Sequence, residues 1–313
     1  MIISASRRTD IPAFYSDWFV NRVREGFLLV RNPFNAHQIT RVSLNPEDVE
    51  MFVFWTRNPS KLMDFLPAMD EKGYRYYFQY TITGYPRAIE KSVPNPLRAV
   101  ETFTDLSQKI GRDKVVWRYD PILLSNLLPL NEHKRLFGKI AGMLAGKTNR
   151  VVISFADFYK KTELNLKRVG GLICEDITLQ QEQLLELSAC MAKIAQTHGM
   201  DIKSCAEAVD VAQAGILHGK CIDDSLIKEV FGLSLEGKKD RGQREECGCI
   251  KSIDIGVYNT CLHGCSYCYA NFNHDAVIKN QQKHDPSSPF LLGGVEGVDP
   301  ILLSRDKSQG SLF

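Results

Sequence analysis

Three cysteines stand close together near the C-terminal end of the chain. Cys261, Cys265 and Cys268 occur in the run CLHGCSYCYA, separated by three and then two residues. Thiolates are soft ligands that select iron–sulfur clusters, zinc or Cu(I). Four thiolates would close a metal site, whereas three from one loop can hold three corners of a cubane cluster and leave one iron open. We therefore expect a metal centre on this loop.

Four further cysteines could form a second metal site. Cys247 and Cys249 flank a glycine shortly before that loop, and Cys205 and Cys221 lie upstream. Together they would complete an auxiliary iron–sulfur cluster or a closed tetrahedral zinc site. Alternatively, Cys205 and Cys221 are small buried apolar residues, and only the Cys-Gly-Cys pair, or nothing, binds metal. The two remaining cysteines are expected to be structural: Cys174 and Cys190.

The composition is that of an ordinary globular protein. The chain has 313 residues, of which 44% are hydrophobic and 24% charged, and its formal net charge is +2. This charge does not support a broad nucleic-acid surface, although a local one could exist. The sequence has neither the ~20 apolar residues of a spanning helix nor a secretory signal pattern. We expect a cytoplasmic protein without a membrane partner, in which clustered cysteines indicate metal rather than disulfides.

Short apolar strands alternate with helices along most of the chain. Seven strands are predicted: Ile2–Ser6, Met51–Thr56, Tyr74–Thr83, Val115–Tyr119, Val151–Phe155, Asp201–Ser204 and Ile253–Tyr258. Helices are predicted over Ser16–Glu25, Pro96–Gly111 and Leu179–His198, with a hairpin or excursion over Phe27–Ser43. This alternation predicts the α/β class, with a mainly parallel sheet forming a full or partial (β/α) barrel.

The same pattern predicts how the chain is divided. We expect the α/β barrel over residues 1–234 and a polar linker with the Cys-Gly-Cys segment over 235–250. The last barrel strand and the cysteine loop would occupy residues 251–273, and an irregular tail would occupy 274–313. The C-terminal region is therefore predicted to be rich in cysteine.

Polar side chains collect where the predicted strands end. In a (β/α) barrel, the carboxyl ends of the strands carry the active site. The candidates for catalytic roles are Arg7, Arg8, Asp10, Arg118 and Asp120. Alternatively, Arg118 and Asp120 pair with each other across the rim. Arg7 and Arg8 could bind an anion such as a substrate phosphate, or form ion pairs of their own.

The cysteine loop resembles the Cys-x-x-x-Cys-x-aromatic-Cys signature of the radical S-adenosylmethionine superfamily, with Tyr267 at the aromatic position. The resemblance implies that the three cysteines hold a [4Fe–4S] cluster whose fourth iron binds S-adenosylmethionine. It implies reductive cleavage of that cofactor to a 5′-deoxyadenosyl radical, with electrons from a reductase or a flavodoxin- or ferredoxin-type donor. Tyr267 would pack beside the adenine. Further cofactor-binding candidates are Thr9, Arg57 and Gln79.

The position of the loop along the sequence differs from its usual position in that superfamily. Its members normally carry the loop after the first barrel strand, whereas here it follows the last predicted strand. A circularly permuted barrel, with Ile253–Tyr258 beside Ile2–Ser6, would reconcile the two. Three short segments are similar to the spore photoproduct lyase-like branch: Arg7–Pro12, Trp55–Asn58 and Tyr119–Ile122. The whole chain also resembles the domain of unknown function 1848 family.

The competing interpretation is a non-catalytic metalloprotein. A zinc-stabilised binding module would need a fourth ligand for the loop, which His263 or an upstream cysteine could supply. An iron–sulfur electron carrier would use its cluster for electron transfer alone. The sequence does not specify the substrate, whether a small molecule or another class.

Overall fold

The computed structural model describes residues 1–205, 207–235, 237–240 and 242–304. Eight strands form one sheet in the order β10-β1-β4-β5-β6-β7-β8-β9, and every neighbouring pair is parallel. The strands are β1 (Ile2–Ala5), β4 (Met51–Thr56), β5 (Tyr76–Thr81), β6 (Val115–Ile122), β7 (Arg150–Phe155), β8 (Asp201–Cys205), β9 (Leu217–Gly219) and β10 (Ile253–Asp254). The α/β class with a parallel sheet is confirmed. Within the described residues the sheet stays open between β9 and β10, so a fully closed barrel is not formed.

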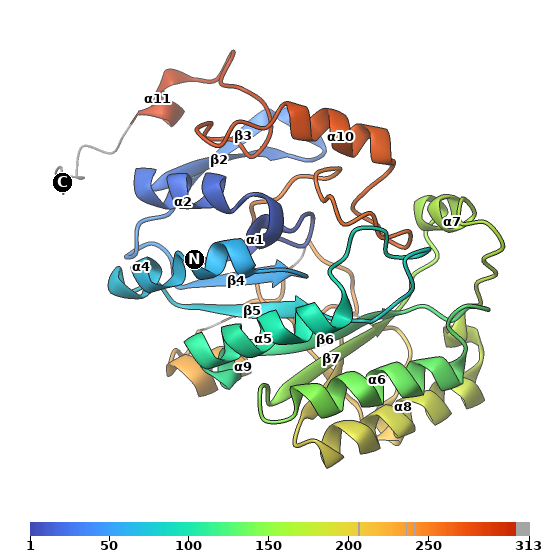
Figure 1. Cartoon of the computed structure of the whole chain (residues 1–313). Helices are drawn as coiled ribbons and strands as arrows, with labels where there is room; N and C mark the ends of the chain where they lie inside the picture. Colours follow the sequence, from blue (N-terminus) through green and yellow to red (C-terminus); the bar gives the residue numbers. More distant parts are fainter. Residues whose placement is uncertain (206, 236, 241, 305–313) are drawn as a thin grey trace.

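Long amphipathic helices cover one face of this sheet (Figure 1). They are α5 (Pro96–Ile110), α6 (Leu130–Leu144) and α8 (Gln181–Thr197). Asn95 caps α5, because its side chain accepts a hydrogen bond from the Leu97 amide, and Gly111 ends the helix as predicted. The other helices are α1 (Ile11–Phe14), α2 (Ser16–Glu25), α3 (Ser60–Met63), α4 (Leu66–Glu71), α7 (Lys160–Leu166), α9 (Asp224–Phe231), α10 (His274–Gln282) and α11 (Pro300–Leu303). None of the helices in the described part of the chain is long and apolar enough to cross a bilayer.

Side chains alternate between the two faces of the strands, as the period of a β-strand requires. In β4, Phe52 and Phe54 belong to the core beneath the helices, whereas Met51 and Val53 belong to a second core on the opposite face. Near the carboxyl ends of the strands, this opposite face becomes polar. In β4, Trp55 follows Met51 and Val53 on this face and is only partly buried. The polar residues therefore lie at the edge where the cavity described below opens.

The chain after β9 covers the second face. Ile222, Leu226, Cys249 and Ile250 pack there in the same buried cluster as Met51. The Cys-Gly-Cys part of the segment predicted over residues 235–250 is therefore anchored to the sheet by buried side chains.

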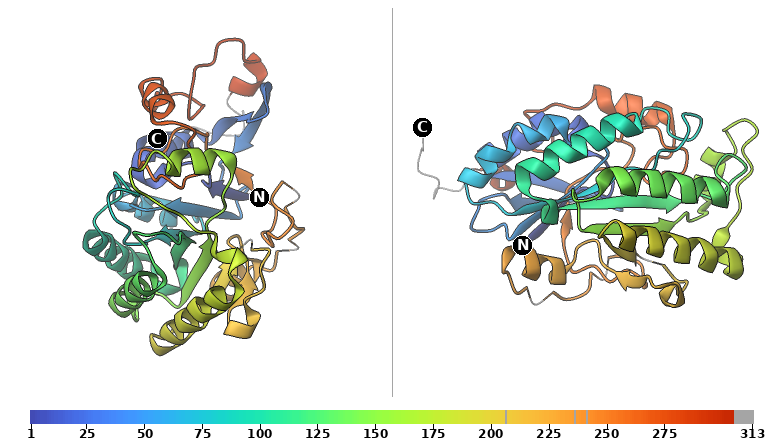
Figure 2. Two further views of the ribbon diagram at one scale, coloured as in Figure 1. Left: turned by 90° about the vertical axis from the view of Figure 1, so that its right-hand side faces the viewer. Right: turned by 60° about the horizontal axis from the view of Figure 1, so that its bottom comes forward.

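The C-terminal segment returns to the N-terminal part of the chain. The antiparallel hairpin of β2 (Phe27–Asn32) and β3 (Asn35–Ser43), which the sequence predicts, packs beside residues 284–304 in all views (Figures 1 and 2). The Leu29 amide donates to the Pro289 carbonyl at 2.9 Å. The tail was expected to be irregular, but α10 and α11 form there because Asn273 and Asp299 cap them. The last part of that expected tail, residues 305–313, lies outside the described residues.

The predicted adjacency of the last and first strands is confirmed. Ile3 pairs with Ile253 and Ser4 with Asp254. The Asp254 carboxylate accepts hydrogen bonds from the Ser4 hydroxyl (2.9 Å) and the Ser6 hydroxyl (2.7 Å). β10 is shorter than predicted, because the same carboxylate accepts from the Gly256 amide at 3.0 Å and turns the chain out of the sheet.

His133 of α6 provides a pH-dependent term in the stability of the fold. It is fully buried, its Nδ1 lies 3.0 Å from the Tyr119 hydroxyl, and its Nε2 lies 3.1 Å from the Leu123 carbonyl. Burial lowers the pKa of His133 to about 4. The folded protein therefore holds the neutral ring, whose stabilising contribution is complete above pH 6.5 and declines as the pH falls toward 4.

We predict that His133→Gln removes this acid sensitivity. Between pH 7 and pH 5 the unmodified protein should lose roughly 1–2 kcal/mol more unfolding free energy than the variant. Urea unfolding at the two pH values measures the difference. Identical pH dependence in the two proteins would show that His133 does not titrate between folded and unfolded states.

Candidate metal centre and cavity

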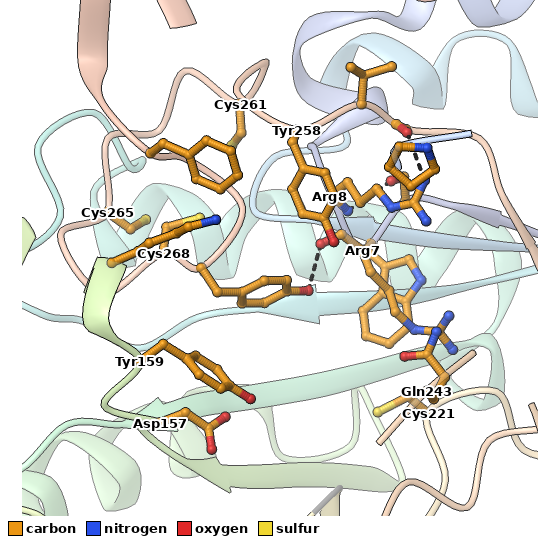
Figure 3. Close-up of a pocket in the computed structure, with 18 of the residues that line it drawn as sticks. Arg7, Arg8, Asp157, Tyr159, Cys221, Gln243, Tyr258, Cys261, Cys265 and Cys268 are labelled. Carbon is orange, nitrogen blue, oxygen red and sulfur yellow. Dashed lines mark hydrogen bonds between the residues drawn. The ribbon is translucent and has the colours of Figure 1, made fainter. Parts of the chain in front are cut away.

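A cavity of about 1140 Å³ opens at the carboxyl ends of the strands (Figure 3). Its wall includes residues from the ends of β1, β4, β6, β7 and β8 and from the cysteine loop. Of the predicted site residues, those that line it are Arg7, Arg8, Arg57, Arg118, Asp120, Tyr267 and all seven cysteines of the two predicted sets. Three other candidates are buried and do not form its lining: Thr9, Asp10 and Gln79.

The cysteine loop follows β10 and is held by backbone hydrogen bonds to the segment after β5. The Ser92 amide donates to the His263 carbonyl, and the Ser266 amide donates to the Ile89 carbonyl, both at 2.9 Å. Cys265 also forms an isolated antiparallel bridge with Glu90. These contacts fix the backbone on which the cysteines stand, and Figure 3 shows Cys261, Cys265 and Cys268 on one side of the cavity.

The three thiols of the loop influence one another electrostatically. Burial raises the pKa of the Cys265 thiol to about 12, with Arg57 opposing the shift and Glu90 and Cys268 adding to it. Burial, followed by the charge of Cys268, also raises the pKa of Cys261. These raised pKa values keep the thiols protonated when no cation is bound. A bound metal cation would stabilise the thiolates, and its binding would release their protons.

Asp10 joins three loops behind the cavity wall. Its Oδ2 accepts hydrogen bonds from the Arg57 amide and from His263 Nε2, each at 2.7 Å. Its Oδ1 accepts from the Thr56 hydroxyl at 2.8 Å and from the Ala13 amide at 2.9 Å. Asp10 was predicted as a catalytic candidate, and the structure places it instead as a buried support for the cysteine loop.

A second buried network fixes Tyr267. Arg57 forms an ion pair with Glu90 at 3.0 Å, and both side chains hydrogen-bond to the Tyr267 hydroxyl. The Thr83 hydroxyl donates to Glu90 at 2.7 Å. Sequence reasoning missed Glu90, because this loop residue belongs to no recognisable motif.

Arg118 and Asp120 pair with each other, which was one of the two alternatives predicted for them. Arg118 Nε donates to Asp120 Oδ1 at 3.0 Å, and its NH2 also contacts the carboxylate. Arg118 NH1 donates to the Cys221 thiol at 2.7 Å. Gln79, predicted as a cofactor-binding residue, donates from its amide nitrogen to the Cys221 carbonyl at 2.8 Å. Gln79 and Arg118 thus support the second cysteine set.

Within the described residues, no group of three or more His, Cys, Asp or Glu side chains is already arranged to hold a metal ion. The loop nevertheless fits an iron–sulfur cluster by its donor chemistry. A cubane cluster binds each thiolate to a different iron, so its ligands do not converge on one point. The Nδ1 atom of His263 is buried without a hydrogen-bond partner, which leaves a polar atom between Cys261 and Cys265 available to a bound group.

We predict that Asp10→Ala loosens the cysteine loop. The substitution leaves His263 and the Arg57 and Ala13 amides without their acceptor, so we expect a loss of about 3–5 kcal/mol in unfolding free energy. Hydrogen exchange of residues 261–265 should accelerate. Asp17→Ala, on the exposed first turn of α2, is the control and should cost less than about 1 kcal/mol. Equal losses, with unchanged exchange in the loop, would contradict this role.

Comparisons with known proteins identify the family of the chain. No curated protein matches its sequence. Among solved structures, one from Bacteroides thetaiotaomicron VPI-5482, described as "a putative alpha-L-fucosidase", is similar at 10% identity and a TM-score of 0.26, covering 54% of this chain and 68% of that one. That likeness is too low to carry an argument. The family model described as "Domain of unknown function (DUF1848)" matches residues 2–270, and the chain therefore belongs to the DUF1848 family.

Proposed function

We propose that this protein is a radical S-adenosylmethionine enzyme. The observation that carries the proposal is the Cys-x-x-x-Cys-x-Tyr-Cys loop, which follows the strand paired with β1 and lines the cavity at the carboxyl edge of a parallel sheet. Cys261, Cys265 and Cys268 would hold a [4Fe–4S] cluster. When bound, the cluster supplies the electron that cleaves S-adenosylmethionine reductively into methionine and a 5′-deoxyadenosyl radical.

Circular permutation of a barrel would explain why the loop lies late in the sequence. Because β10 pairs with β1, the loop begins beside the first strand, where a permuted barrel would carry it. The open sheet has the strand order of a partial (β/α) barrel, with β10 inserted before β1 at its edge. Permutation would change the position of the loop along the sequence but not the strands beside it in space.

The residues around the loop would bind and orient S-adenosylmethionine. Arg57 and Glu90 fix the hydroxyl of Tyr267, so the tyrosine ring would be held rigidly for packing against the adenine. Arg8 lies on the same cavity wall, and its guanidinium can pair with the carboxylate of the cofactor. Its charge is positioned over the ring of Tyr258, 5.4 Å from the centroid.

The cavity also provides protection for a reactive radical. Trp55, Tyr258 and Tyr269 contribute aromatic surface to its lining, which restricts water around the reacting groups. The proposed reaction needs a reducing compartment such as the cytoplasm and a one-electron donor of the flavodoxin, ferredoxin or reductase type. The volume of the cavity leaves room for a substrate beside the cofactor. The chemical class of that substrate is a question for experiment.

We predict that the anaerobically reconstituted and reduced protein converts S-adenosylmethionine to 5′-deoxyadenosine and methionine. A variant in which Cys261, Cys265 and Cys268 are all replaced by Ala should lack this activity, because the cluster has lost its ligands. The matched control is Cys174→Ala, which removes a thiol outside both cysteine sets and should keep the activity. Liquid chromatography with mass spectrometry measures both products.

Two results would contradict the proposal. One is an iron-loaded, reduced protein that forms no 5′-deoxyadenosine. The other is equal product formation by the triple variant and the unmodified protein. Stoichiometric zinc without iron uptake would instead support the zinc-stabilised binding module.

Tyr267→Phe separates positioning by Tyr267 from cluster binding. The variant keeps the ring but loses the hydroxyl that contacts Arg57 and Glu90, an interaction with charged groups worth about 1.5–3 kcal/mol. We predict a KM for S-adenosylmethionine raised by about tenfold or more, with unchanged iron content. An unchanged KM would mean that the Tyr267 anchor has no part in cofactor binding.

A further inference from the structure

Three separate segments bring four cysteines together on the cavity wall. Cys205 ends β8 and is paired with Gly219 of β9, two residues before Cys221. The segment that carries Cys247 and Cys249 returns to this place, because the Ile250 amide donates to the Ile222 carbonyl at 3.2 Å. The Sγ atoms of Cys205 and Cys221 lie 2.6 Å apart.

The four cysteines are all buried, and two of them are in direct contact. None of the four residues is more than 6% exposed. All four belong to one buried cluster on the second face of the sheet. The Sγ of Cys249 accepts from the Ile222 amide at 3.3 Å. If Cys205 and Cys221 were only small apolar residues, nothing would require four thiols from three segments to converge.

Two arginines lie beside this set. Arg118 NH1 donates to the Cys221 sulfur at 2.7 Å. The Arg7 guanidinium lines the same cavity and has a buried NH2 without a hydrogen-bond partner. Four thiolates around a dication keep a net charge of about −2, which Arg7 can partly offset, while Arg118, already paired with Asp120, donates a hydrogen bond to the set. Ordinary buried thiols would need no such compensation.

We propose that Cys205, Cys221, Cys247 and Cys249 are the ligands of a second metal centre, a closed four-thiolate site on the wall of the same cavity. Its chemistry suits a thiophilic centre, either an iron–sulfur cluster or a zinc ion. In Figure 3, Cys221 lies across the view from Cys261, Cys265 and Cys268, so this member of the second set stands apart from the cysteine loop. The proposal does not depend on the proposed radical chemistry.

Metal binding requires a limited rearrangement of the set. Tetrahedral zinc with Zn–S bonds of ~2.3 Å keeps its sulfurs ~3.8 Å apart, more than the separation of Cys205 and Cys221. These two sulfurs must therefore move apart on binding. Cys249 stands beside a glycine, Gly248, in a segment separate from the sheet ladder, so it can adjust without breaking the pairing of β8 with β9.

The test compares the metal content of the full-length chain and three variants after anaerobic reconstitution, once with iron and sulfide and once with zinc. The variants are Cys205→Ser/Cys221→Ser, Cys261→Ser/Cys265→Ser/Cys268→Ser, and Cys174→Ser/Cys190→Ser as the control. With an iron–sulfur cluster at the second site, the unmodified chain should bind about eight irons and each of the first two variants about four. With zinc there, the Cys205/Cys221 variant alone should lose one zinc ion per chain.

Equal metal content in the Cys205/Cys221 variant and the unmodified chain would overturn the proposal. If the triple variant binds as much iron as the unmodified chain but the Cys205/Cys221 variant does not, the second site stands and the proposed function fails. Circular dichroism checks that each variant folds.

X-ray absorption of the metal-loaded triple variant provides a test that leaves the second set intact. Its first shell should contain about four sulfurs at ~2.3 Å for a zinc ion, or sulfur-only ligation with iron neighbours for a cluster. A shell dominated by oxygen or nitrogen would overturn the assignment, even if the Cys205/Cys221 variant did not fold.

Discussion

The pairing of β10 with β1 is the constraint on which the arrangement of the site depends. Four donors converge on the Asp254 carboxylate: the hydroxyls of Ser4 and Ser6 and the amides of Arg7 and Gly256. A half-buried carboxylate needs such donors to replace the water that it has lost. This one fixes both the end of β1 and the start of the cysteine loop. A Cβ on Gly256 would lie 1.9 Å from Ser6 Oγ, so the two segments approach as closely as glycine allows.

Two buried acidic residues, Asp10 and Glu90, connect the loops that form the cavity wall. Asp10 connects the loop after β1 to the loop after β4 and to His263, and Glu90 connects Arg57 to Tyr267. Each carboxylate is paired and hydrogen-bonded, which is the condition under which buried charge is tolerated. The cysteines thus stand on a loop fixed at several points, which would pre-organise it for a bound group.

The sequence predicted the elements better than it predicted the contacts. Strands such as Met51–Thr56 were found because a buried parallel strand is a short, continuous apolar run. The adjacency of β10 and β1 followed from the place of the cysteine loop and the closure rule for a barrel. β9 was missed, since Leu217–Gly219 is three residues long and two of them are exposed. α10 was missed as well, because it has one fully buried residue and little apolar periodicity.

For the site, residue type indicated the candidate ligands but not the residues that hold them in place. Cysteine spacing is a local property, so the loop could be read from the sequence. The partners of Asp10, Gln79 and Glu90 lie up to 253 residues away along the chain, and no local pattern encodes such contacts. Gln79 accordingly lies beneath Cys221 rather than in the cavity lining, where it was expected.

The electron paramagnetic resonance spectrum of the anaerobically reconstituted and reduced chain, recorded with and without S-adenosylmethionine, tests the central claim most directly. The loop provides three thiolate ligands, so a cluster held by it keeps one iron open to a further ligand. The account predicts a cluster signal that changes when S-adenosylmethionine is added. A cluster signal indifferent to S-adenosylmethionine, or the absence of any iron-based signal, would contradict it.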